Sequence, residues 1–270
     1  MLPPDISRIT EKQEIERFLI EADLTQIMNN FLHNERVVRV TASGIKELFI
    51  PSGEHLEIKQ IPYFITEYCD GGNLEQIAAA EFPLQSKIKI FAQIADAISF
   101  MHTNYHMIHR DLKPDNILLT KDKNPILIDF GSFEIIGRTG RTFELGTIPY
   151  FSPTQAESML TIGHHNKNQG TLKLSPHTYR TDMYTFTLVI ADMIYLDRTD
   201  NPVQKIQDLY DYSPDELAYY KYIASDPELV FPETGNTALD KTLAKGISNK
   251  PKERFSSMQE MADSLFDLLK

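Results

Sequence analysis

The sequence has a single cysteine, Cys69, and no apolar run long enough to span a membrane. One cysteine excludes an internal disulfide, which favours a reducing compartment. The longest apolar candidate, residues 185–196, is shorter than a membrane span and contains Asp192. The first residues, MLPPDISRITEKQE, lack the charged-then-apolar pattern of a signal peptide. We therefore expect a cytoplasmic protein with no membrane span; secretion by a route that needs no signal peptide is the alternative.

Positive charge is also scarce, because 27 Lys and Arg residues stand against 38 Asp and Glu residues and the net charge is −11. No stretch concentrates Lys and Arg, so the composition argues against a nucleic-acid partner. The acidic balance is compatible with basic peptide substrates, although ordinary solubility is the simpler explanation. A chain of 270 residues without internal repeats can form one large domain or two small lobes around a cleft.

The most informative stretch is HRDLKPDN at 109–116, followed by DFG at 129–131. In this pattern Asp111 precedes Asn116 by five residues, and Asp129 stands directly before Phe-Gly. Such spacing suits metal-assisted phosphoryl transfer, because one carboxylate can orient and deprotonate a hydroxyl. The amide and the second carboxylate can hold Mg²⁺ against nucleotide phosphates. The complete pattern is far more specific than an isolated HRD.

From Ile61 to the C-terminus the chain resembles the catalytic region of the eukaryotic-type protein kinases. A lysine two residues after Asp111, here Lys113, makes the chain more similar to the serine/threonine-specific branch than to the tyrosine-specific branch. The resemblance implies an α+β, two-lobed kinase-like fold, with a truncated small β lobe containing one helix and a mainly helical large lobe. We expect the small lobe at 1–69, with a hinge at 66–70, and the large lobe at 70–270. The implied cofactors are ATP and Mg²⁺, and the implied partner is a protein substrate with a Ser or Thr acceptor.

The same resemblance assigns catalytic roles. Asp111 would accept the substrate hydroxyl proton, and Lys113 would neutralise charge on the moving phosphoryl group. Asn116 and Asp129 would be the metal ligands. Thr147, in a segment GTIPYFSPT that resembles the end of a kinase activation segment, would hydrogen-bond Asp111 and Lys113 and so help to select Ser or Thr acceptors.

A strand that runs into Gly71-Gly72 resembles the kinase hinge, and the alternative is an ordinary strand and turn. By this match Thr66 is the gatekeeper, and the Glu67 carbonyl and the Cys69 amide meet adenine. Asn73 would lie near the ribose. Leu118 would form the apolar floor under adenine or belong to the core.

The first sixty residues depart from the family. They contain no G-x-G-x-x-G, only Gly44 and Gly53, and no recognisable strand lysine. Arg8 and Glu21 could form a replacement cation–carboxylate pair at the phosphates, with Arg8 as a plain solvent residue the alternative. A phosphate-directed cation can contribute several kcal/mol of transition-state stabilisation. Three explanations fit the missing glycine-rich loop and strand lysine. An unusual cation replaces the lysine, an activating protein partner completes the small lobe, or the protein no longer transfers phosphate.

Two further departures concern ion pairs. Arg110 normally helps to receive a phosphate, yet Glu134 stands where a second basic residue is usual. Either Glu134 pairs with Arg110 without phosphorylation, or Thr139 and Thr142 are phosphosites. The family's buried Glu partner of Arg254 has become Thr154, so we expect Glu157 as a substitute partner or a solvent-exposed Arg254.

Periodicity and turn residues predict the local elements. Helices are expected at 11–32, starting from Thr10 as N-cap, and at 85–104, 181–196, 213–224, 236–246 and 256–269. In 85–104 the apolar stripe expected to be buried is Ile88, Phe91, Ile94, Ala95, Ile98 and Met101. Strands are expected at 36–41, 48–50, 56–58 and 125–129, with a turn at Ser43-Gly44. In the third helix Asp182 should anchor the catalytic loop, while Thr187 replaces a usual glycine. Residues 159–179, including His164-His165, are expected to form a solvated loop, with substrate docking as the alternative.

The leading hypothesis is a protein serine/threonine kinase. A pseudokinase that serves as a binding module is the runner-up, supported by the missing glycine-rich loop and strand lysine. A small-molecule phosphotransferase is a third reading, which the intact GTIPYFSPT segment disfavours.

Overall fold

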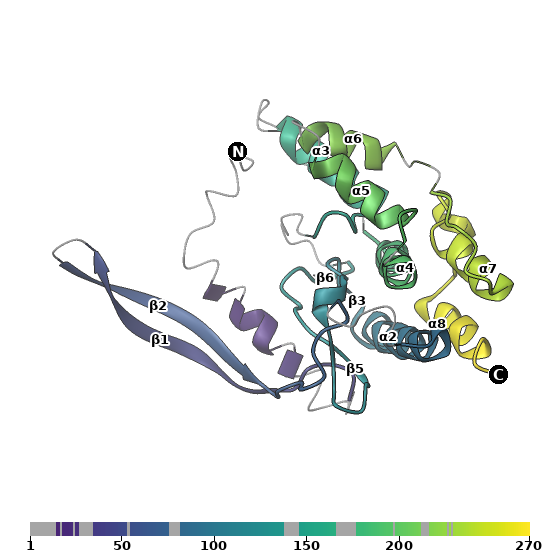
Figure 1. Ribbon diagram of the computed structural model, residues 1–270. Coiled ribbons are helices and arrows are strands. Elements are labelled where there is room, and N and C mark those ends of the chain that lie inside the picture. Colours follow the sequence, from purple (N-terminus) through teal and green to yellow (C-terminus); the bar gives the residue numbers. More distant parts are fainter. Residues whose placement is uncertain are drawn as a thin grey trace.

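The computed structural model describes residues 15–16, 18–23, 25–26, 35–52, 55–75, 82–137, 146–165, 177–196, 198–211, 216–225, 227 and 229–270. These residues have the mixed helix-and-strand, two-part architecture expected from the sequence (Figure 1). A hairpin and a short helix form the small part, and helices dominate the large part. Within the described residues, no helix is long and apolar enough to cross a bilayer.

The small part is built on a two-stranded antiparallel hairpin, β1 (Val40–Ser52) with β2 (His55–Thr66). Figure 1 shows that it extends away from the helical body. The prediction of several short strands is therefore wrong, because two long strands replace them. Among the described residues the hairpin is a sheet of its own.

The predicted turn at Ser43-Gly44 is also wrong, since both residues lie inside β1 opposite Phe64 and Tyr63. The Tyr63 ring covers Gly44, where an added Cβ would lie 3.1 Å from the Tyr63 hydroxyl oxygen. An aromatic neighbour of this kind shields the backbone of a strand glycine. A turn signal in the sequence is thus overridden by a cross-strand contact.

The segment ahead of β1 joins the small part to the large one. Val38 N donates to Leu127 O at 3.0 Å, and Leu127 N donates to Arg36 O at 2.7 Å. The predicted strand at 36–41 is therefore divided, with residues 36–38 bonded to the large lobe and β1 starting at Val40.

The predicted N-terminal helix is confirmed for residues 15–16, 18–23 and 25–26. Its apolar face points inward, with Ala22 fully buried. Phe18 packs on Phe64 of the hairpin at a ring-centroid distance of 4.8 Å. Thr10 and the rest of 11–32 lie outside the described residues.

The large lobe contains seven described helices: α2 (Leu84–Tyr105), α3 (Pro153–His165), α4 (Tyr179–Tyr195), α5 (Pro202–Asp211), α6 (Glu216–Ala224), α7 (Thr237–Gly246) and α8 (Met258–Asp267). Five of them match predicted helices. Helix α5 was not predicted, and α3 shows that a solvated loop at 159–165 is wrong. Residues 166–176 of that expected loop lie outside the described part. Side chains of Asn236 and Ser257 cap α7 and α8, as their residue types favour.

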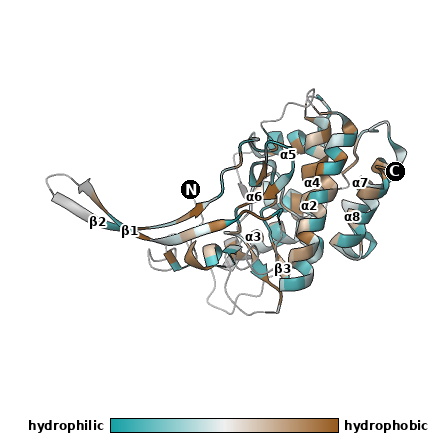
Figure 2. Ribbon diagram, turned by 90° about the horizontal axis from the view of Figure 1, so that it is seen from below, coloured by the Kyte–Doolittle hydropathy of each residue, from teal (hydrophilic) through white to brown (hydrophobic). Residues whose placement is uncertain are grey.

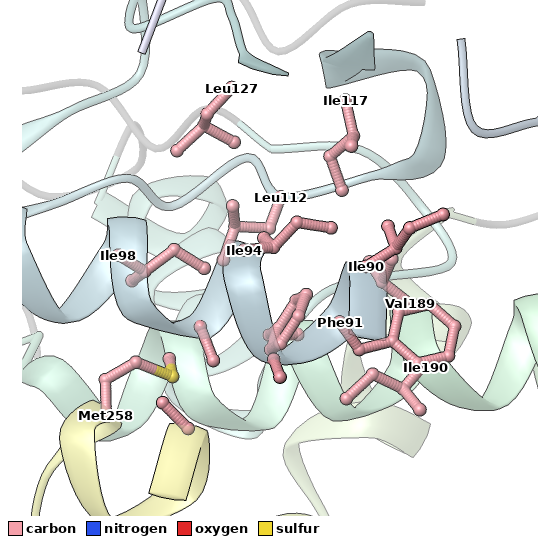
Figure 3. Close-up of a cluster of buried hydrophobic side chains, with 14 of the residues drawn as sticks. Ile90, Phe91, Ile94, Ile98, Leu112, Ile117, Leu127, Val189, Ile190 and Met258 are labelled. Atoms are coloured by element: carbon pink, nitrogen blue, oxygen red, sulfur yellow. The ribbon is translucent and has the colours of Figure 1, made fainter. Parts of the chain in front are cut away.

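Helix α2 supplies the centre of the core. Its predicted apolar stripe is fully buried: Ile88, Phe91, Ile94, Ala95, Ile98 and Met101. Figure 3 shows how this stripe meets side chains from α4, α8 and the segment after α2, with Leu112, Val189 and Met258 among them. The catalytic segment is thereby packed directly onto the core.

Two small antiparallel pairs deliver the functional segments. Strand β3 (Met107–Ile108) pairs with β6 (Glu134–Ile135), and β4 (Ile117–Leu119) pairs with β5 (Pro125–Leu127). The strand predicted at 125–129 ends two residues earlier, because Asp129 takes a φ of 62° that a strand cannot contain.

Candidate active site

Asp182 of α4 anchors the backbone of the catalytic loop, as predicted. One carboxylate oxygen of Asp182 accepts from His109 N at 2.8 Å, and the other accepts from Arg110 N at 2.9 Å. His102 contacts the first oxygen at 2.8 Å. Burial alone would raise the pKa of Asp182, but the hydrogen bond and charge of His102 and the other donors lower it below its ordinary value.

Two residues in this region have strained backbones. Arg110 has φ 65° and Asp129 has φ 62°, which non-glycine residues seldom adopt. Each such residue costs on the order of 1–3 kcal/mol, so the surrounding structure must enforce it. The carboxylate of Asp182 does this for Arg110 through the backbone hydrogen bond. Both residues lie in the recognised HRD and DFG motifs, while His106 and Lys123 have positive φ outside these motifs.

Asp111, Lys113 and Thr147 meet in one hydrogen-bonded group. The Thr147 hydroxyl donates to Asp111 Oδ1 at 2.7 Å and accepts from Lys113 Nζ at 2.9 Å. Lys113 Nζ lies 3.6 Å from Asp111 Oδ2. The contacts expected for Thr147 are therefore present, while the role of Thr147 in selecting acceptors stays a prediction.

Asn116 is oriented by the same carboxylate residue. Its Nδ2 donates to the Asp111 backbone oxygen at 2.9 Å and lies 3.4 Å from Asp111 Oδ2. With the nitrogen turned toward Asp111, the Oδ1 end of the amide points the other way. Ile128 N donates to Asn116 O at 3.0 Å, which places the next residue, Asp129, beside Asn116.

The exposed Asp129 and the oriented Asn116 amide are oxygen donors of the kind that Mg²⁺ takes. Gly131 N donates to Asp129 Oδ1 at 3.2 Å. Across the described ranges, no cluster of three or more His, Cys, Asp and Glu side chains could hold a metal. A site of one carboxylate, one amide and nucleotide oxygens fits the donors present. The side chains of His164-His165 are not described.

Glu21 contacts the DFG segment rather than standing apart from it. Its Oε1 accepts from Phe130 N at 3.1 Å, and Glu21 is buried. The Phe130 ring is buried as well and lies 5.2 Å from the His109 ring. The N-terminal helix is therefore tied to the catalytic segment. Arg8 lies outside the described residues, so the Arg8–Glu21 pair stays a prediction.

The glycine pair after the hinge has a specific structural cause. Gly71 N donates to Leu119 O at 2.9 Å and Leu119 N donates to Gly72 O at 2.7 Å, so this segment pairs with β4. A Cβ on Gly71 would lie 2.3 Å from the Thr120 backbone oxygen, and Gly72 has φ 79°. The first glycine permits close approach and the second permits positive φ.

The expected adenine-binding positions lie along this connection. Thr66 ends β2, and Glu67 N donates to Arg39 O at 3.0 Å. The Glu67 carboxylate accepts from Arg39 N at 2.8 Å, which fixes the start of the expected hinge. Cys69 is partly buried, and burial, followed by the charges of Glu67 and Asp70, raises the pKa of its thiol.

The two remaining nucleotide positions are adjacent in space. Asn73 and Leu118 form a β-bridge, and Leu118 is partly buried against the core. Asn73 Nδ2 donates to Asp115 Oδ1 at 2.7 Å. Their expected contacts with ribose and adenine stay predictions.

Arg254 takes a different environment from the one expected. Its side chain is buried, so the solvent-exposed alternative is wrong. The guanidinium donates to Ser248 O at 2.7 Å and Arg180 O at 3.2 Å, and it lies 4.7 Å from the centre of the Tyr184 ring. Backbone carbonyls and an aromatic face can stabilise a buried cation. The pairing with Glu157 stays a prediction.

The predicted contact between Arg110 and Glu134 is confirmed, with Arg110 Nη1 3.0 Å from Glu134 Oε2. Sequence reasoning missed two residues here, His177 and Gln155. His177 Nδ1 lies 2.9 Å from Glu134 Oε2, and Gln155 Nε2 donates to Arg110 O at 2.8 Å. Neither belongs to the recognised motifs, so only the fold brings them to Arg110.

The chain matches known proteins over most of its length. It is 27% identical over 246 residues to serine/threonine-protein kinase PknB of Mycolicibacterium smegmatis, covering 87% of this chain and 33% of that protein. It is 30% identical over 207 residues to the interferon-induced, double-stranded RNA-activated protein kinase of Rattus norvegicus, covering 69% and 36%. A putative serine/threonine-protein kinase of Mycoplasma genitalium is 30% identical over 151 residues, covering 52% and 38%. The chain thus spans about a third of the length of these curated relatives.

A family model described as the protein kinase domain matches residues 6–266. This range contains the catalytic loop, the DFG segment and the N-terminal helix that contacts it. The chain therefore belongs to the protein kinase family.

Proposed function

We propose that this chain is an ATP- and Mg²⁺-dependent protein serine/threonine kinase with Asp111 as catalytic base. The observation that carries the proposal is the Thr147 hydroxyl placed between Asp111 Oδ1 and Lys113 Nζ. This contact joins the expected base, the expected phosphate-directed cation and the segment expected to receive the substrate. The similarity to serine/threonine kinases supports the same acceptor class.

In the proposed reaction, Asp111 accepts a hydrogen bond from the acceptor hydroxyl and takes its proton late in transfer. Asn116 holds Asp111 through its Nδ2, and Lys113 offsets negative charge on the transferred phosphoryl group. Mg²⁺, when bound by Asn116 and Asp129, would neutralise charge on the nucleotide phosphates. The segment from Thr66 to Asn73, with Leu118, would hold the adenosine.

The experiment is transfer of labelled γ-phosphate from ATP to a generic basic protein, with sugars and aminoglycosides as parallel acceptors. We expect Mg²⁺-dependent label on serine or threonine of the protein and none on the small molecules. Asp129→Asn should abolish transfer, while Asp122→Asn, at an exposed turn, should not. Equal label in the wild type and Asp129→Asn would reject the proposal.

The second candidate is a pseudokinase that binds a partner or a nucleotide. It is favoured by Gly44, one of only two glycines in residues 1–60, which lies within β1 under Tyr63 rather than in a phosphate-binding turn. Nucleotide affinity with and without Mg²⁺ separates the candidates when combined with the transfer assay. Binding without transfer to any acceptor supports the pseudokinase.

An activating protein partner is the second part of the proposal. The hairpin carries exposed apolar side chains at alternate positions of β2: Ile61, Tyr63 and Ile65. Apart from this hairpin, the described residues of the small lobe form no strand, and these side chains lie exposed, where a partner could cover them. We also propose that the lobes divide at 1–69 and 70–270. Limited proteolysis near 66–72 tests that boundary, and cleavage elsewhere alone would contradict it.

A further inference from the structure

The Arg110 side chain is held by two acceptors from the segment that follows DFG. Its guanidinium is fully buried, with Nε donating to Ser132 O at 2.6 Å and Nη1 lying 3.0 Å from Glu134 Oε2. Ser132 and Glu134 both follow the DFG segment, so Arg110 fastens the start of the activation segment to the catalytic loop. A charge-assisted hydrogen bond of this kind is stronger than a neutral one.

His177 brings a third segment to the same carboxylate. It directly precedes Thr178, which caps α4, and its Nδ1 lies 2.9 Å from Glu134 Oε2 and 3.4 Å from Arg110 Nη1. Burial raises the pKa of Glu134, but the hydrogen bond from His177 and the charge of Arg110 outweigh it and hold the pKa below its ordinary value. The carboxylate is therefore ionised under neutral conditions.

Gln155 extends this group to the segment expected to bind substrate. Its side chain is buried, and its Nε2 donates to Arg110 O at 2.8 Å. Its Oε1 accepts from Ser152 N at 3.1 Å and from the Ser152 hydroxyl at 3.0 Å. One amide thus joins the residue before Asp111 to the segment that follows Thr147.

The charge at Arg110 disfavours a phosphate in this position. Glu134 already supplies a negative charge directly against the guanidinium, and its side chain is 26% exposed on the side open to solvent. A phosphoryl group carries about −1.5 to −2 charges at neutral pH, so it would be repelled by Glu134 at close range. Glu134 therefore already supplies Arg110 with the negative charge that a phosphate would bring.

We propose that Arg110, Glu134, His177 and Gln155 form a phosphate-independent lock that keeps the activation segment attached to the catalytic loop. This inference rests on the proposed kinase function and concerns its regulation. Glu134, His177 and Gln155 are positioning residues, because they act on the loop that carries Asp111 and not on substrate. The lock makes phosphorylation of Thr139 and Thr142 unnecessary for activity.

The first test compares phosphatase-treated wild type with the double variant Thr139→Ala/Thr142→Ala. Both should keep kcat within about twofold of the untreated protein, because the contacts of the lock are made by Arg110, Glu134, His177 and Gln155 and need no phosphate. A loss of tenfold or more in either would overturn the proposal. Neither change depends on a variant within the lock, so the test holds even if those variants fail to fold.

The second test is Glu134→Gln, which keeps the shape of the side chain and removes its charge. We expect kcat to fall about tenfold with the KM for ATP unchanged, since the lock does not touch the nucleotide site. Glu253→Gln is the matched control, because Glu253 forms an exposed ion pair with Lys250. A kcat for Glu134→Gln equal to that of the control would reject the lock.

The third readout does not need activity. Hydrogen–deuterium exchange of the nucleotide-free protein should become faster in residues 146–155 for Glu134→Gln and Gln155→Ala, with the core of α2 unchanged. Unchanged exchange in 146–155 would overturn the lock. If the wild type shows no phosphotransfer while exchange responds as expected, the proposed function fails and the lock remains.

Discussion

The Thr147 hydroxyl is the smallest group on which the proposed chemistry depends. It fills the space between Asp111 and Lys113 and satisfies both. We predict that Thr147→Val, which keeps the shape but removes the hydroxyl, lowers kcat about tenfold or more. Thr147→Ser should restore most of the activity in the same peptide assay. Equal loss in both variants would show that the hydroxyl alone does not account for the effect.

Thr187 and Gly246 are a complementary pair. Thr187 stands where the family usually has glycine, and its hydroxyl donates to Met183 O at 2.7 Å within α4. A Cβ on Gly246 of α7 would lie 2.1 Å from Thr187 Oγ1. The glycine needed for close packing of these helices is therefore on α7, which the sequence pattern of α4 alone could not reveal.

This pair gives a double-mutant prediction. Gly246→Ala should destabilise the protein by about 1–3 kcal/mol, because the added carbon overlaps Thr187. In the Thr187→Ala background the same change should cost much less, since the clashing atoms are gone. Urea unfolding of the four proteins measures the coupling. Additive effects would contradict direct contact between the two positions.

At the scale of elements, periodicity was sufficient where one helix face meets the core. Helix α2 buries the stripe that its sequence predicts, and α8 buries Met258, Met261 and Leu265 in the same way. Prediction failed where local signals compete with distant contacts. Gly44 is typical of a turn, but in the structure it lies within β1 and the Tyr63 ring covers it. Helix α3 has little apolar periodicity, and its packing against α6 stabilises it instead.

The hairpin is the element least protected by the rest of the chain. Figure 2 shows apolar segments along it, outside the helical body. Phe49 and Ile58 are cross-strand partners that are 65% and 58% exposed. Exposed apolar strands with free edges promote association between molecules.

We therefore predict that Phe49→Thr/Ile58→Thr reduces concentration-dependent association without lowering the melting temperature. Threonine keeps a β-branched side chain in the strand and removes apolar surface. Light scattering over a concentration series measures the association. The matched control is Leu209→Thr, at an exposed position of α5. An equal reduction in the control would show that association does not depend on the hairpin.

For the whole molecule, one buried carboxylate, Asp182, and one partly buried carboxylate, Glu134, link stability to pH. The pKa of Asp182 and that of Glu134 are both lowered in the folded state. A lowered pKa contributes stability above the unfolded value of about 4, and this contribution is lost as pH falls through the folded value. We predict that the urea midpoint falls steeply below about pH 4 and that Glu134→Gln has a flatter profile. Parallel profiles would contradict the assigned role of Glu134.

The sequence predicts the catalytic loop well, because the residues of this loop are close together in the chain and are all expected to serve phosphoryl transfer. Asp111 and Asn116 are five residues apart, and Asp182 follows a recognisable pattern at the start of α4. It could not predict His177, Gln155 or the surroundings of Arg254, because each depends on carbonyls or carboxylates brought together by tertiary packing.

The most direct test of the central claim is the effect of Asp111→Asn on transfer and on binding in the same preparation. Because Asp111 is proposed to take the proton and not to hold the nucleotide, kcat should fall about 10²–10⁴-fold. The affinity for ATP with Mg²⁺ should remain within about twofold of the wild type. Transfer that is undiminished in Asp111→Asn, with the same phosphorylated serine or threonine, would show that this residue is not the base.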